Sequence, residues 1–156
     1  MAAGADGVMF MPFGHPYLSD QGALAYFRDV MKELRCPVMI YKKADIPSNE
    51  LLLNLARDPR VVGVKYAVNN MAQFRQTILA DQTGTQWLCG SAERFAPFFM
   101  LAGSTGYTTG AGNLCPHQRD VGRPGRAKGI EVGARVLVLA HLAIDLLERL
   151  RHLVHV

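Results

Sequence analysis

The sequence predicts an α/β fold with a parallel sheet. Five short apolar segments of the kind that form buried strands begin near residues 7, 38, 61, 86 and 106. Segments with helical spacing separate them, and the resulting repeat of roughly 20 to 30 residues is typical of successive β-α units. The strand segments are apolar runs, as expected for parallel strands that are covered on both faces.

Capping residues and prolines delimit the first two β-α units. Ser19 and Ser48 have side chains suited to cap helix N-termini, and Pro59 ends the second helix. A loop with two prolines and a glycine, residues 12–18, joins the first strand to its helix. The expected elements are a strand over 7–11, a helix over 20–35, a strand over 38–41 and a helix over 49–57.

The later units follow the same pattern and end in a different kind of segment. Residues 131–154 carry a broad apolar face at helical spacing, which predicts an amphipathic helix for packing or oligomerisation. His141 and Asp145 lie four residues apart on it, but a pair without a third ligand does not predict a metal site. The other expected elements are a strand over 61–65, a helix over 71–80, a strand over 86–89, a helix that ends at 100 and bends at Pro97, and a strand over 106–109.

Two architectures fit this pattern, an open doubly wound sheet and part of a (β/α)8 barrel. An open sheet that binds a nucleotide normally has a glycine-rich phosphate loop after its first strand, and PFGHPYLS at 12–19 is not such a loop. Polar residues instead follow several strands, where barrel enzymes build their sites, so we predict an incomplete (β/α)8 TIM barrel of about five β-α units. These polar residues are Tyr41, Lys65, Ser91, Glu93, Thr108 and Thr109.

Lys65 is the residue on which a chemical function depends. It ends the apolar segment VVGVK, and desolvation at the mouth of a buried strand favours the neutral amine. A neutral amine can add to a ketone carbonyl and form a Schiff base. The alternative is a lysine that extends its charge from a strand end into solvent, and the strand alone favours this second interpretation.

Composition and charge exclude several classes of protein. The 156 residues are 49% hydrophobic and 19% charged, which suits one globular domain, and no apolar stretch reaches the ~18 residues of a membrane span. The N-terminus lacks a secretory signal pattern, so we expect a cytoplasmic protein. Residues 1–117 carry 10 basic and 9 acidic side chains and residues 118–156 carry 7 and 4, so most of the net charge of +4 lies in the tail and no nucleic-acid site is predicted. The three cysteines, which predict neither disulfides nor a metal site, are Cys36, Cys89 and Cys115.

Four segments carry a resemblance to a known family. They are GADGVMFMPF at 4–13, CPVMIY at 36–41, VVGVKYA at 61–67 and WLCGSAERFAPFFMLAGSTGYTTGAGNLCP at 87–116. In order and spacing they resemble the second half of the dihydrodipicolinate synthase and N-acetylneuraminate lyase family, Schiff-base lyases built on a (β/α)8 barrel. The most specific features are the strand ending in Tyr41, the Gly-x-Lys strand after it, and the glycine-rich segment ending in Asn113 and Pro116.

The resemblance implies roles for the residues that follow the strands. Lys65 would form the Schiff base with pyruvate or another 2-keto acid without a cofactor, and Tyr41 would transfer a proton between substrate and solvent. Gly90 and residues 106–110 would shape the pocket floor, although the glycines fit tight turns equally well and Tyr41 alone fits an ordinary strand tyrosine. The implied substrate-binding residues are Gly90, Ser91, Glu93, Thr108 and Thr109.

Departures from the family argue against dihydrodipicolinate synthesis itself. In the synthase an arginine after the tyrosine strand binds a substrate carboxylate; here the loop is KKADIPS, with Ile46 near that position, and Lys42 or Lys43 is left to supply a point charge. Residues 13–14 replace a further tyrosine of the synthase. A sugar-acid aldolase or dehydratase fits better, and solvated loop residues are the simpler alternative for its candidate hydroxyl-binding residues. These are His15, Tyr17 and Glu93.

The resemblance covers an incomplete barrel. Three earlier β-α units of the family, with a Gly-Thr-Thr-Gly type loop that binds the keto-acid carboxylate, have no counterpart in the sequence. Five units cannot close an eight-stranded barrel, so we expect exposed edges on the first and last strands and assembly as a homo-oligomer or with a complementing chain. We divide the chain into a partial barrel over 1–117 and a divergent basic linker with a C-terminal helix over 118–156.

Two hypotheses from different classes follow. The first is a truncated Schiff-base lyase acting on pyruvate or another 2-keto acid by aldol cleavage, condensation or dehydration. The second is a catalytically inactive barrel remnant that acts only through self-association or partner binding. Covalent trapping of pyruvate on Lys65 distinguishes them.

Overall fold

The computed structural model describes residues 6–109 and 136–138, and the statements below concern these ranges. All strand pairs are parallel, and the six-stranded sheet has the order β5-β4-β3-β2-β1-β6. The elements along the chain are β1 (Gly7–Phe10), α1 (Asp20–Glu33), β2 (Val38–Lys42), α2 (Asn49–Leu55), β3 (Val61–Tyr66), α3 (Met71–Ala80), β4 (Gln86–Cys89), α4 (Ala96–Leu101), β5 (Gly106–Tyr107) and β6 (Val136–Val138).

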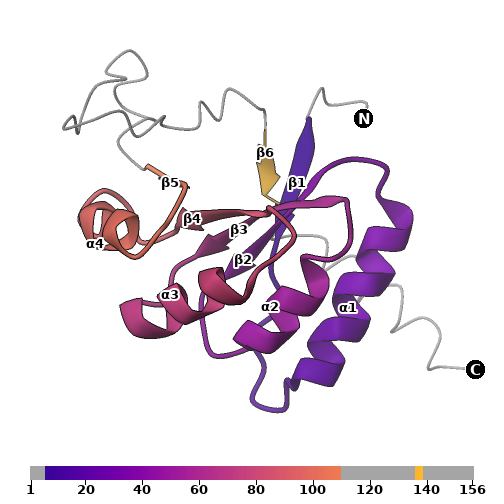
Figure 1. Cartoon of the computed structure of the whole chain (residues 1–156). Coiled ribbons are helices and arrows are strands. Elements are labelled where there is room, and N and C mark those ends of the chain that lie inside the picture. The colour runs from indigo at the N-terminus through magenta and orange to yellow at the C-terminus, as the bar shows by residue number, and fades with distance from the viewer. Residues whose placement is uncertain (1–5, 110–135, 139–156) are drawn as a thin grey trace, which may run out of the picture.

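Strands and helices alternate from β1 to β5, which confirms the predicted series of β-α units. Helices α1, α2 and α3 lie along one face of the sheet, and α4 lies beside β4 and β5 (Figure 1). The predicted caps are also present, because the side chains of Ser19 and Ser48 accept hydrogen bonds from the backbone N–H groups of Gly22 and Leu51. Short local signals therefore fix where α1 and α2 begin.

Several element boundaries differ from the prediction by one or two residues, with β1, α1 and α2 ending earlier, at Phe10, Glu33 and Leu55, and α4 ending one residue later, at Leu101. Strands β2 and β3 each continue one residue past the predicted end, so Tyr41 and Lys65 are penultimate rather than last. Strand β5 ends at Tyr107 and leaves Thr108 and Thr109 in the following segment. Pro97 stands in the first turn of α4 and does not bend it, because a proline there lacks only an N–H that has no partner within the helix.

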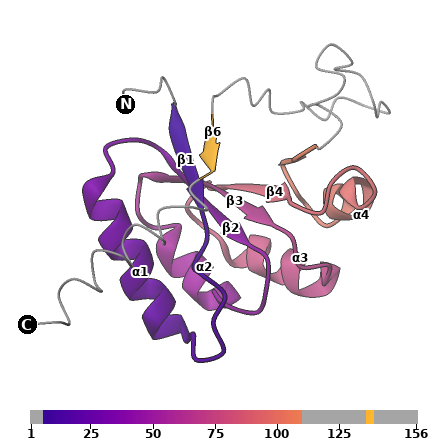
Figure 2. The same ribbon diagram turned by 180° about the vertical axis from the view of Figure 1, so that it is seen from behind.

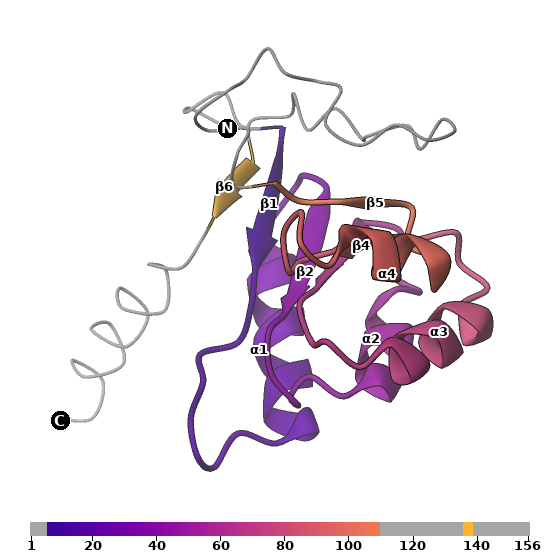
Figure 3. The same ribbon diagram turned by 90° about the vertical axis from the view of Figure 1, so that its left-hand side faces the viewer.

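The C-terminal helix predicted over 131–154 is wrong for the three of its residues that the structure describes. Val136–Val138 form β6, which pairs in parallel with Gly7–Met9 of β1 (Figures 2 and 3). The expected exposed edge of β1 is therefore covered at these positions. The edge of a sheet presents unpaired N–H and C=O groups, and β-branched valines suit a strand that pairs with them. His141, Asp145 and the rest of the predicted helix lie outside the described residues.

The core lies between the sheet and its helices and is rich in aromatic side chains. Phe74 of α3 is fully buried, and its ring centroid lies 4.7 Å from that of Phe99, 5.0 Å from that of Tyr66 and 6.5 Å from that of Trp87. These partners come from α4, β3 and β4. A second group, Phe10 with Tyr26 and Phe27, joins β1 to α1.

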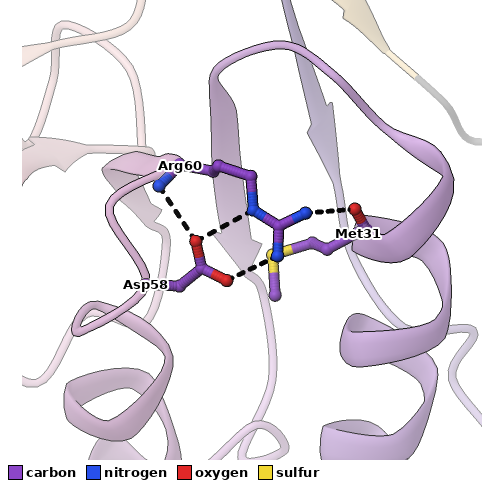
Figure 4. Close-up of polar contacts among 3 residues, drawn as sticks. All are labelled: Met31, Asp58 and Arg60. Atoms are coloured by element: carbon purple, nitrogen blue, oxygen red, sulfur yellow. Dashed lines mark hydrogen bonds and ion pairs between the residues drawn. The ribbon is translucent and has the colours of Figure 1, made fainter.

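Arg60 connects two elements at the N-terminal end of the sheet (Figure 4). Its guanidinium makes two hydrogen bonds to the carboxylate of Asp58, at 3.0 and 2.6 Å, and donates a third to the carbonyl oxygen of Met31 in the last turn of α1. The arginine therefore connects the C-terminal end of α1 to the turn before β3. At such a helix end the last carbonyl groups lack partners within the helix. This cluster lies at the end of the strands opposite Tyr41 and Lys65.

The Asp58 contact predicts a pH dependence of stability. The hydrogen bond from Arg60 lowers the pKa of Asp58 below its ordinary value of 3.8. A lowered folded-state pKa stabilises the protein above the unfolded-state pKa, and this contribution is lost as pH falls through the folded-state value. We expect Arg60→Met to lower the urea midpoint at pH 7, with a difference from the unaltered chain that shrinks as pH falls below about 3.8.

The control for this prediction is Lys32→Met. Lys32 forms an ion pair with Asp29 on α1, and both side chains are 69% exposed. Exposed pairs of this kind contribute little, so its urea midpoint should match that of the unaltered chain at each pH. Equal effects of the two substitutions would show that the Arg60 cluster contributes nothing beyond surface charge.

Candidate active site

Tyr41 and Lys65 lie side by side at the C-terminal end of the sheet. Strands β2 and β3 pair in parallel with Tyr41 opposite Lys65, so both side chains project from the same face of the sheet. The Nζ atom of Lys65 lies 4.3 Å from the centroid of the Tyr41 ring. Lys65 and Tyr41, the two residues predicted to be catalytic, are thus in contact.

Burial of Lys65 favours its neutral form, whereas two neighbouring groups favour the ammonium. Burial lowers the pKa of Lys65, and interaction with Cys89 acts in the other direction. The face of the Tyr41 ring also stabilises the charged form, because a cation is attracted to an aromatic quadrupole. With the net shift downward, the proton of Lys65 is easier to remove than that of an exposed lysine, which increases the share of free amine near neutral pH.

Gly90 allows the end of β4 to approach Lys65. A Cβ atom on Gly90 would lie 2.9 Å from the Cγ atom of Lys65 and 2.9 Å from the Cβ atom of Ala67. The Gly90 N–H also donates to the carbonyl oxygen of Tyr66 at 2.7 Å, so the glycine is fixed against the end of β3. The absence of a side chain here makes room for the stem of the lysine.

The other predicted substrate-binding residues meet at the same end of the sheet and bond to protein groups. The Ser91 hydroxyl donates to Oδ1 of Asn69 at 2.6 Å. The Thr108 backbone N–H and hydroxyl both donate to the carbonyl oxygen of Cys89, at 2.9 and 3.2 Å. The Thr109 hydroxyl donates to Oε1 of Glu93. These bonds join the loop after β4 to the loop after β3, and the segment after β5 to β4 and the loop after it. A direct substrate contact by any of these residues stays a prediction.

An open pocket of about 580 Å³ lies between the loops that follow β1 and β2. Tyr41 lines it and also contacts Lys65, so the tyrosine connects the pocket with the amine. His15 lies in its wall and accepts a hydrogen bond on Nδ1 from the Tyr17 backbone N–H. Tyr17 is 89% exposed. The remaining lining residues are Met11, Pro12, Gly14, Pro16, Leu18, Lys43, Ala44, Asp45 and Ile46.

The two consecutive lysines after Tyr41 have different surroundings, which the sequence did not indicate. Lys42 is buried, and its ammonium donates to three backbone carbonyls within its own loop. It is therefore unavailable as a point charge for a substrate. Lys43 is exposed and lines the pocket, so it keeps this predicted role.

The described residues contain no group of three or more metal-ligating side chains. Of the cysteines, Cys89 is a buried free thiol and Cys36 a half-buried one, while Cys115 lies outside the described part, as do Asn113 and Pro116. In the same part of the chain, none of the helices is long and apolar enough to span a membrane.

Comparison with known proteins identifies the family. The sequence model of the dihydrodipicolinate synthetase family matches residues 1–121. A 4-hydroxy-tetrahydrodipicolinate synthase 1 from Streptomyces coelicolor is 30% identical, with an alignment that covers 92% of this chain and 50% of the relative. A probable 5-dehydro-4-deoxyglucarate dehydratase from Ralstonia nicotianae is 30% identical over 74% of this chain and 38% of the relative.

Solved structures give the same result for the fold. The dihydrodipicolinate synthases from Oceanobacillus iheyensis and Bacillus clausii superimpose with a TM-score of 0.68 each, at 38% and 42% identity. Each superposition covers 74% of this chain but only 39% and 40% of the respective structure. The chain thus spans half or less of the length of these relatives, and its parallel β-α units are part of their (β/α)8 barrel. The chain belongs to the dihydrodipicolinate synthetase family.

Proposed function

We propose that this chain carries the Schiff-base centre of a lyase acting on pyruvate or another 2-keto acid. The observation that carries the proposal is the contact between Lys65 and Tyr41, with the Lys65 pKa lowered by burial. The free amine of Lys65 adds to the ketone carbon and forms a carbinolamine. Protonation of the carbinolamine hydroxyl releases water and leaves a protonated imine on Nζ.

Tyr41 is the proposed proton carrier in this sequence. Its ring lies against Lys65 and its side chain lines the neighbouring pocket, so its hydroxyl can serve a substrate that extends from the amine into that pocket. Loss of a proton from the carbon next to the imine then gives an enamine. This nucleophile supports aldol condensation, and the reverse reaction supports cleavage.

The pocket favours a sugar acid over dihydrodipicolinate synthesis. Its wall contains Lys43, His15 and Asp45, which offer both donors and acceptors to hydroxyl groups, and lacks an arginine among the residues that line it. The relationship to a protein described as a dehydratase of a deoxyglucarate supports the same choice. We propose a hydroxylated 2-keto acid as the substrate class.

The test is reductive trapping. Borohydride reduces an imine to a stable secondary amine, so incubation with pyruvate and borohydride should leave a pyruvate-derived adduct on Lys65, located by mass spectrometry of the peptides. Lys65→Met should carry no adduct, and Lys32→Met, which changes an exposed lysine on α1, should be labelled like the unaltered chain. Labelling spread evenly over exposed lysines would refute the proposal. So would an unlabelled Lys65 under conditions that label a full-length relative.

A second candidate function, association without catalysis, is favoured by one observation. Phe98 and Leu101 of α4 are 58% and 86% exposed, and α4 lies beside β5, the last strand of the sheet. The alignments cover only 50% of one relative and 39% of one solved structure, so these proteins contain further chain that this one does not match. We propose that the α4 surface contacts another polypeptide, either a second copy or a complementing chain. Solution mass from light scattering, compared between the unaltered chain and Leu101→Glu, tests this role without substrate.

A further inference from the structure

The buried ammonium of Lys42 sits in a cage of backbone carbonyls. Its Nζ atom donates to the carbonyl oxygens of Ala44 at 2.9 Å, Asp45 at 2.9 Å and Pro47 at 2.6 Å, so all three ammonium protons have acceptors. The side chain is 3% exposed, and Nζ lies 5.7 Å from the centroid of the Tyr66 ring. An isolated buried charge is costly, and here the carbonyl dipoles compensate for the lost water.

Burial and two nearby carboxylates have opposite effects on the pKa of Lys42, and the net shift is downward. Burial lowers the pKa of Lys42, whereas the carboxylates of Asp45 and Asp20 raise it. Asp20 comes from the first turn of α1 and also accepts a hydrogen bond from the Ser48 backbone N–H at 2.8 Å. The ammonium therefore joins the end of β2 to the loop after it, and the Ser48–Asp20 hydrogen bond joins the end of that loop to the start of α1.

The caged loop is also the wall of the pocket beside Tyr41. Residues 43–46 all line that pocket, and two of the four, Ala44 and Asp45, supply carbonyl oxygens to the Lys42 ammonium. The ends of the loop are held by other contacts, since the Lys42 carbonyl accepts from the Ala67 N–H and Ser48 caps α2. Its middle is held by the ammonium.

We propose that Lys42 is a positioning residue, an internal cation that fixes the 43–47 loop and thereby holds the pocket wall in place beside Tyr41. Consecutive strand residues point to opposite faces, so Tyr41 faces Lys65 while Lys42 faces the loop and Tyr66. The same strand end thus supplies one residue to the proposed chemistry and the next to the support of the pocket. The functional part of this inference rests on the proposed function, whereas the loop-fixing part does not.

The test removes the ammonium and then supplies it from solution. Lys42→Ala should raise at least tenfold the hydrogen-exchange rates of the Ser48 and Leu51 amides, which donate to Asp20 and to the Ser48 hydroxyl at the end of the loop, and leave those of β3 and α3 unchanged. Addition of n-propylammonium, which has the length and the three N–H donors of the missing side chain, should restore the protection. Tetramethylammonium carries the same charge without donors and should not restore it.

Two further variants keep the inference falsifiable. Lys42→Met retains most of the apolar stem and lacks the donors, so it should show the same loop exchange if the alanine variant is too unstable to measure. Lys43→Ala changes the neighbouring exposed lysine and should leave loop protection unchanged. Unchanged loop exchange in Lys42→Met, or a uniform rise over the whole sheet that n-propylammonium does not reverse, would overturn the inference.

The exchange experiment contains no substrate, so it separates this inference from the proposed function. If Lys65 of the unaltered chain is trapped by pyruvate, Lys42→Met should reduce the rate of trapping. If the unaltered chain is never trapped while the loop responds as expected, the proposed function fails and the loop-fixing role stands.

Discussion

Gly90→Ala is expected to reduce reductive trapping at Lys65 by about 100-fold, an effect close to that of removing the lysine. The added Cβ would lie 2.9 Å from the Cγ atom of Lys65, 2.9 Å from the Cβ atom of Ala67 and 3.0 Å from the carbonyl carbon of Tyr66. The Tyr66 carbonyl carbon belongs to the backbone and the Ala67 Cβ is attached directly to it, so neither can move independently of the chain at the end of β3. The lysine stem therefore has to shift, and a displacement of about 1 Å at a reacting group can cost a factor of this size.

The matched control for Gly90 is Gly22→Ala on α1. A Cβ there would lie 3.6 Å from the Ser19 Oγ and 3.9 Å from Leu18, which are ordinary contact distances. The Gly22 N–H bond to Ser19 needs no change, and alanine is favoured over glycine in a helix by up to about 1 kcal/mol. Mass spectrometry after borohydride treatment measures the adduct, and the urea midpoint measures the fold. Equal adduct in both variants would show that Gly90 does not control the position of the lysine.

The pairing of Tyr41 with Lys65 could be predicted because it needs only local information. Each residue lies near the end of an apolar segment, and the carboxyl ends of parallel strands meet at one edge of the sheet. Strands β2 and β3 both end one residue later than predicted, so Tyr41 and Lys65 still lie opposite each other. Gly90 was assigned to a pocket floor from the resemblance, but only the coordinates show that its neighbour is the lysine stem.

The difference between Lys42 and Lys43 could not be predicted in this way. The sequence shows two adjacent lysines, and the choice of which one is buried depends on how the following loop returns over the strand. The hydrogen bond from Arg60 to Met31 is equally long-range, since 29 residues separate the partners. Neither contact has a signature within a window of a few residues.

At Val136–Val138 a clear local signal gave the wrong prediction. These residues have helical periodicity with their neighbours, and this periodicity is the primary local signal. In the structure they pair with β1, more than 120 positions earlier in the chain, where an edge strand offers unpaired backbone groups. Propensity is a weak indicator when such a partner is available, because tertiary context overrides it.

Phe74→Ala is expected to have the largest effect on stability, about 3 to 5 kcal/mol out of a total that is typically about 5 to 15 kcal/mol. Phe74 is fully buried, and its ring contacts those of Tyr66, Trp87 and Phe99. The truncation leaves a cavity among side chains from β3, β4 and α4, and these elements cannot collapse into it without disturbing the sheet. A partial barrel has less buried surface to compensate, so the urea transition should shift strongly or disappear.

Leu79→Ala on the same helix is the matched control for Phe74. Leu79 is 66% exposed, so its truncation should change the unfolding free energy by no more than about 0.5 kcal/mol. Both variants are measured by urea unfolding followed by circular dichroism and by solution mass. If Leu79→Ala destabilises the chain as much as Phe74→Ala does, the exposed side of α3 is covered by another subunit, and the sheet with its four helices is not the unit that unfolds. If Phe74→Ala alone is destabilising, the aromatic cluster between β3, β4 and α4, rather than the outer side of α3, stabilises the fold.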